Sequence, residues 1–78
     1  MAKKIKKEVY VEYQGELDHD KDYKMDAEAK NFEGKFGGSG YFFPNMTRDR
    51  HYSFKDEKKA KAFAARVRRA FKAKASVE

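Results

Sequence analysis

The feature that most constrains the fold of this chain is an apolar stripe of helical period in its last third. Five residues form the stripe, at positions i, i+3, i+4, i+7 and i+11: Ala60, Phe63, Ala64, Val67 and Phe71. These positions share one face of an α-helix. The interval holds no Gly or Pro, and its Ala, Lys and Arg residues are strong helix formers. Asp56 or Ser53 supplies the N-cap, because either side chain can accept a backbone hydrogen bond. We therefore predict one long amphipathic helix.

Segments before this helix alternate between apolar and polar residues, as half-buried strands do. Residues 5–13 alternate and contain Val, Ile and Tyr, which favour strands. Residues 23–29 alternate again, and the polar break at 14–21 is typical of a hairpin loop between two strands. A glycine-rich segment at 31–40, whose glycines suit tight turns or a bulge, leads to a short aromatic strand at 41–43. Residues 48–54 form either a fourth strand or the end of a bent third one.

Together these segments predict an α+β fold in the order ββ(β)βα. A three- to four-stranded antiparallel sheet packs against one C-terminal amphipathic helix. We expect residues 1–78 to form one small domain with frayed tails at 1–4 and 75–78. The chain of 78 residues contains no Cys, so aliphatic and aromatic packing must form its core without disulfides. Phe63 is expected to lie in that core.

Composition and motifs favour a non-enzymatic cytoplasmic protein without metal or cofactor. No signal-like apolar run follows the basic start, and no stretch approaches the ~20 apolar residues of a membrane span. The run Asp18–Asp22 resembles the start of a calcium loop, but Tyr23 stands where the loop needs Gly and Ala29 where it needs Glu. The glycines at 37–40 precede a strand rather than the helix that a phosphate loop requires. Neither His19 nor His51 stands in a recognisable catalytic pattern.

Charge is distributed unevenly along the chain. The formal net charge is +6. Residues 16–33 carry a net charge of −4, whereas residues 46–75 carry +8. Such asymmetry bears on the choice of partners rather than on the fold.

The first functional hypothesis is binding of nucleic acid or of a nucleoprotein complex through the basic helix. Arg is preferred where phosphate is bound in a bidentate manner, and outward aromatic rings can stack on bases. The candidate contact residues are Arg48, Arg50, Lys58, Lys61, Arg66, Arg68, Arg69 and Lys72, together with Tyr41 and Phe42. A three-stranded sheet followed by one helix, with residues 52–56 at the junction, resembles the arm-binding domains of phage integrases and related plant DNA-binding domains. That resemblance implies DNA binding.

The second hypothesis is a phage-type inhibitor or adaptor, anti-CRISPR-like in general character, that binds a host protein. In this case an acidic surface would imitate a phosphate backbone, or the basic helix would dock on an acidic protein. The acidic surface would consist of Asp18, Asp20, Asp22, Asp26 and Glu28. No membrane partner is expected, and exposed sheet edges leave both a monomer and a homodimer open.

Overall fold

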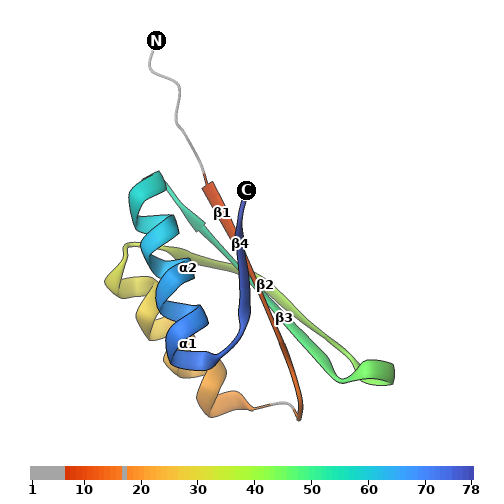
Figure 1. Cartoon of the computed structure of the whole chain (residues 1–78). Helices are drawn as coiled ribbons and strands as arrows, with labels where there is room; N and C mark the ends of the chain where they lie inside the picture. Colours follow the sequence, from red (N-terminus) through yellow and green to blue (C-terminus); the bar gives the residue numbers. More distant parts are fainter. Residues whose placement is uncertain (1–6, 17) are drawn as a thin grey trace.

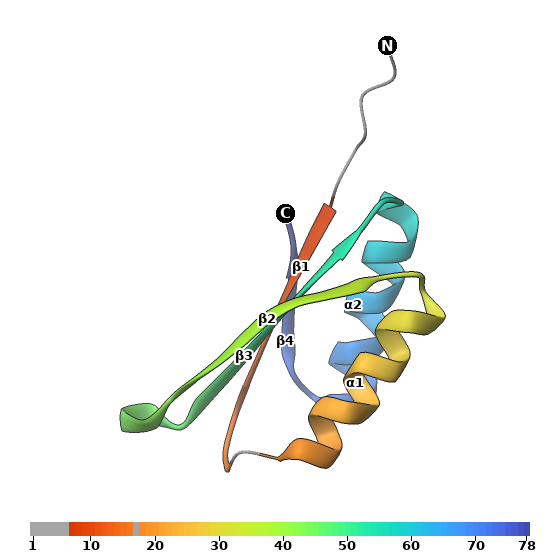
Figure 2. The same cartoon turned by 180° about the vertical axis from the view of Figure 1, so that it is seen from behind.

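The computed structural model of the chain describes residues 7–16 and 18–78. Its elements are β1 (Lys7–Gln14), α1 (His19–Asn31), β2 (Lys35–Phe42), the short 3-10 helix η1 (Phe43–Asn45), β3 (Thr47–Phe54), α2 (Glu57–Phe71) and β4 (Lys74–Val77). The strands form one sheet in the order β2-β3-β1-β4, and every neighbouring pair is antiparallel. Both helices cover the same side of this sheet, and the β2–β3 hairpin extends beyond them (Figures 1 and 2). This βαββαβ arrangement is the ferredoxin-like, or split β-α-β, topology.

The α+β class and the antiparallel sheet are confirmed, but the order ββ(β)βα is wrong because a helix lies between the first two strands. Residues 23–29, predicted as a strand, belong to α1. Asp18, predicted in a hairpin loop, is the N-cap of α1 and accepts a hydrogen bond from the Lys21 backbone N–H at 3.0 Å. The resemblance to integrase arm-binding domains fails for the same reason, since it rested on a one-helix layout.

The error over residues 23–29 has a physical cause. The buried residues of α1 are Asp22, Met25 and Ala29, which are spaced as one helix face requires. A carboxylate therefore occupies an inward position where a pattern search expects an apolar residue. Tyr23, the first residue of the predicted strand, is 77% exposed. Residues 23–29 alternate only because exposed and buried apolar residues of α1 together happen to fall at every second position.

Both edge strands also differ from prediction. The glycine-rich segment, predicted to suit tight turns or a bulge, lies largely in β2 and contains a bulge between Phe36 and Gly38. Gly38 has a φ of +153°, a value that L side chains rarely adopt, so the bulge requires glycine there. At the chain's end, residues predicted to fray form β4, which pairs with β1 from Val9↔Val77 to Glu12↔Lys74. The predicted tail at 1–4 lies outside the described residues.

The predicted amphipathic helix is confirmed as α2, although β4 follows it. Asp56 is its N-cap and accepts a hydrogen bond from the Lys58 backbone N–H at 2.8 Å. Its buried residues are Ala60, Phe63, Ala64 and Val67, and Phe71 packs partly buried against the same core. Phe63 is fully buried, as predicted. The apolar stripe thus holds α2 to the sheet and leaves the opposite side of the helix to solvent.

Candidate nucleic-acid interface

The outward side of α2 carries a row of exposed residues that ends at the helix C-cap. The row consists of Lys58, Ala62, Ala65, Arg69 and Lys72. Successive members are three or four residues apart, so they lie along one line of the helix. Positive charges stand at both ends, about 21 Å apart along the axis at a rise of 1.5 Å per residue. The two alanines between them leave the helix surface open to an extended partner. We call these five residues the α2 basic row.

Carboxylates neutralise the flanks of α2 but not this row. Three ion pairs occupy the flanks: Lys59 with Glu33, Lys61 with Glu57 at 3.1 Å, and Arg66 with Glu28 at 3.2 Å. Within residues 7–16 and 18–78, no carboxylate lies within ion-pair distance of Lys58, Arg69 or Lys72. Among the predicted contact residues of α2, Lys61 and Arg66 are therefore paired with carboxylates. Lys58, Arg69 and Lys72 remain available to a partner.

Arg68 joins α2 to the last strand. Its Nε and Nη2 donate hydrogen bonds to the Ala75 carbonyl oxygen at 3.2 and 2.6 Å. These bonds fix the guanidinium beside Lys72, one helical turn further along. A substitution of Arg68 would alter both the charge and the attachment of β4, so it is a poor probe of binding alone.

The two predicted contact arginines of β3 point inward. Alternation along β3 places Arg48, Arg50, Tyr52 and Phe54 on the side that the helices cover. Arg48 donates from Nε and Nη2 to the Asp22 carboxylate at 3.1 and 2.7 Å. Arg50 is 6% exposed. These two arginines, predicted as nucleic-acid or partner contacts, are therefore engaged with other groups of the protein.

Arg50 lies at the centre of a buried polar network. It donates to Asp26 at 2.6 Å and to the Tyr52 hydroxyl at 2.9 Å. Burial by itself lowers the pKa of the Arg50 guanidinium, but the hydrogen bonds to Tyr52 and Asp26 outweigh it and raise the pKa. Arg50 therefore stays charged, and its role is to satisfy buried carboxylate and hydroxyl groups.

Two of the five residues of the predicted acidic surface, Asp22 and Asp26, belong to the same network. Asp22 is 5% exposed and accepts from the Tyr13 hydroxyl at 2.8 Å. Asp26 pairs with Arg50, Glu28 with Arg66, and Asp18 caps its helix. Of the five predicted acids, only Asp20 is both exposed and without a partner in the part of the chain that the structure describes. Four of the five predicted acids are therefore engaged with other groups of the protein, and Asp22 is buried.

The buried network makes stability sensitive to alkaline pH. Burial, followed by the hydrogen bond to Asp22, raises the pKa of Tyr13 from 10.0 to about 12. Burial also raises the pKa of Tyr52. The native state thus holds these phenol protons more tightly than the unfolded chain, so their stabilisation is complete below pH 10 and is lost as pH rises through about 12. Urea unfolding across this range should show falling stability, with a shallower fall in Tyr13→Phe. An unchanged slope in Tyr13→Phe would contradict the assignment, and Tyr23→Phe, at an exposed tyrosine, serves as control.

The two predicted aromatic contacts lie near the tip of the β2–β3 hairpin, away from α2. The Tyr41 hydroxyl donates to the Gly15 carbonyl at 2.8 Å, and its ring packs against Phe43, so it is a half-buried structural residue. Phe42 is 60% exposed. The structure therefore does not bring Phe42 together with the α2 basic row.

The sheet face opposite the helices carries its own aromatic pair. Tyr10 stacks on His51 with ring centroids 4.6 Å apart and planes 1° from parallel. The His51 Nε2 atom also contacts the Glu8 carboxylate. Strand alternation places Glu12 and Asp49 on the same face. Three carboxylates would repel phosphate there, so this face suits nucleic acid less well than α2 does.

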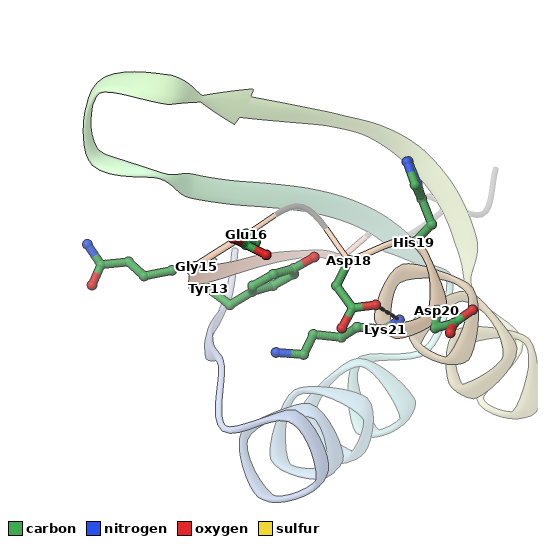
Figure 3. A pocket seen from close by; sticks show the side chains of 8 residues that line it. Tyr13, Gly15, Glu16, Asp18, His19, Asp20 and Lys21 are labelled. Carbon is green, nitrogen blue, oxygen red and sulfur yellow. Dashed lines mark hydrogen bonds between the residues drawn. The ribbon is translucent and has the colours of Figure 1, made fainter.

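An open hollow lies where β1 leads into α1 (Figure 3). Asp18 lies in it but is engaged as the N-cap, and Lys21 lies over the Tyr13 ring at 4.4 Å from its centroid. Across residues 7–16 and 18–78, no group of three or more His, Asp or Glu residues is placed to hold a metal ion. The residues that line the hollow thus cap α1 and pack against Tyr13, and they do not form a recognisable site.

Comparison of the chain with family models, with curated proteins and with solved structures finds no match. Neither of the described helices is long and apolar enough to cross a membrane. The class of protein is thus defined by its topology, a ferredoxin-like α+β domain, and its function has to be argued from its surfaces.

Proposed function

We propose that this protein is a non-enzymatic binding domain that contacts the phosphate backbone of nucleic acid, alone or in a nucleoprotein complex, through the α2 basic row. One observation carries the proposal. Lys58, Arg69 and Lys72 are exposed and have no carboxylate partner among the described residues, whereas most acids near the helices are already paired.

The chemistry of the row favours phosphate. A backbone phosphate brings a full negative charge and condensed counterions, and its neutralisation releases those counterions. Arg69 can also bind a phosphate through two N–H groups. Alanines occupy the middle of the row, so only the side chains at its two ends are long enough to reach base edges. We therefore expect binding that depends weakly on sequence and strongly on salt.

The test is a charge-neutralised triple variant, Lys58→Gln/Arg69→Gln/Lys72→Asn. Asn is chosen at position 72 because that residue has a φ of 52°, which Asn tolerates better than most residues. Fluorescence anisotropy with labelled single-stranded and duplex 20-mers gives the affinity at several salt concentrations. Loss of three phosphate contacts should weaken binding for all sequences and reduce the slope of log K against log salt by about three.

A matched control separates the row from overall charge. Lys24→Gln/Lys30→Gln/Lys35→Gln removes three exposed lysines from outside α2 and changes the net charge equally. This control should bind nearly as tightly as the wild type. Equal losses in the two variants would show that net charge alone governs binding. A wild type without affinity at low salt would show that the row only solubilises the helix.

A further inference from the structure

The β2 edge of the sheet is unusually open to pairing. β2 and β4 are the two edge strands. β4 is short, contains Lys74, and has its Ala75 carbonyl occupied by Arg68. β2 is twice as long, and no charged residue occurs anywhere from 36 to 47. Proteins usually protect edge strands with charges, prolines or covering segments. Within β2, the protective features are the exposed Lys35 at its first residue and the bulge between Phe36 and Gly38.

Exposed apolar side chains gather at both ends of this edge. At one end Phe36 is 50% exposed and lies beside Tyr23 of α1, where the two line a groove between α1 and β2. At the other end Phe42 and Phe43 are 60% and 78% exposed, and Met46 is 42% exposed. Five of the six exposed large hydrophobic residues in the described chain flank β2 in this way; Tyr10 is the sixth.

We propose that two copies of this chain pair through their β2 edges around a two-fold axis at Gly38–Gly40. Antiparallel pairing about this axis brings the Phe36 end of one copy to the Phe42 end of the other, and the reverse contact follows by symmetry. The register with β3 places Phe36 and Tyr41 on the side that the helices cover and Phe42 on the opposite side, and Phe43 packs on Tyr41. On the helix side, Phe36 of one copy therefore comes next to Phe43 of the other, and this contact forms at both ends of the paired strands. The uncharged stretch between them places no like charges opposite one another. The edge is therefore self-complementary, and this property selects a second copy as the occupant.

The pairing also has a consequence for the α2 basic row. This consequence rests on the proposed function. An axis perpendicular to the joined sheet keeps both helix layers on one side. Since α2 packs over β1 and β4, the two helices would lie roughly 25–35 Å apart at a strand spacing of about 4.8 Å. That separation is close to one turn of duplex DNA, about 34 Å. The dimer would present two basic rows to one duplex.

The decisive measurement is the mass of the protein alone, by sedimentation equilibrium, without nucleic acid. This measurement tests the dimer independently of the nucleic-acid binding assay, so either proposal can fail while the other holds. The wild type should shift with concentration from the 9.1 kDa chain towards twice that mass. Ser39→Lys, which places two like charges at the axis, should remain a monomer. Ser76→Lys makes the same change on the other edge strand and should behave as the wild type.

A second variant guards against a folding defect in Ser39→Lys. Phe43→Ser removes a ring that is 78% exposed and should leave the far-UV circular dichroism spectrum unchanged while weakening the dimer at least tenfold. A wild type that stays monomeric up to about 1 mM would overturn the proposal. So would an equal effect of Ser76→Lys, full dimer affinity in Phe43→Ser, or growth into open-ended oligomers.

Discussion

Phe63→Ala is expected to lower the free energy of unfolding by about 3–5 kcal/mol, the cost of deleting a fully buried Phe. The Phe63 ring contacts three others, with centroid distances of 5.1 Å to Tyr52, 5.2 Å to Phe54 and 6.2 Å to Phe32. It therefore joins α2 to β3 and to the end of α1. Small domains have total stabilities near the lower end of about 5–15 kcal/mol, so this variant should be largely unfolded under mild denaturing conditions.

Urea denaturation followed by far-UV circular dichroism measures the effect of Phe63→Ala. Phe43→Ala is the matched control, because it makes the same chemical change at a residue that is 78% exposed. The control should change stability by no more than about 0.5 kcal/mol. Similar midpoints for the two variants would mean that Phe63 does not hold the layers together.

Asp22→Ala should be comparably destabilising, by about 3–5 kcal/mol, because it leaves buried positive charge without its partner. The Asp22 carboxylate accepts from Tyr13 and from Arg48, and Arg50 Nη1 lies 3.5 Å from it. Arg50 retains Asp26, so Arg48 is the group most affected. The loss arises because the Arg48 guanidinium, only 11% exposed, is left without its carboxylate partner, rather than from a cavity.

Asp20→Ala provides the control for Asp22→Ala. It removes an acid from the same first turn of α1, but Asp20 is exposed. Loss of a favourable interaction with the helix dipole should cost about 0.3–1 kcal/mol. If Asp22→Ala unfolds at the same urea concentration as Asp20→Ala, the buried network contributes little and Asp22 is not an essential partner of Arg48.

The two central strands of the sheet and its main helix could be predicted from local pattern, for identifiable reasons. The α2 stripe, the N-cap Asp56 and the inward parity of Tyr52 and Phe54 depend on the residues of one element, and all three are confirmed. α1 could not be found in this way, because Asp22 occupies its inner face and pairs with an arginine far along the chain. β4 was missed because a four-residue strand owes its existence to pairing with β1.

The candidate site, too, has features that follow from the sequence and features that only the tertiary structure determines. Net charge, the concentration of Lys and Arg in the last third, and the outward face of α2 follow from the sequence, since helical periodicity fixes which residues share a side. Which of these charges remain without an ion-pair partner does not follow from the sequence. Arg48 and Arg66 pair with acids more than twenty positions away, while Arg69 and Lys72 do not pair within the described residues. Neutralisation falls steeply with distance between charges, and only the packing of α1 against β3 and α2 sets those distances.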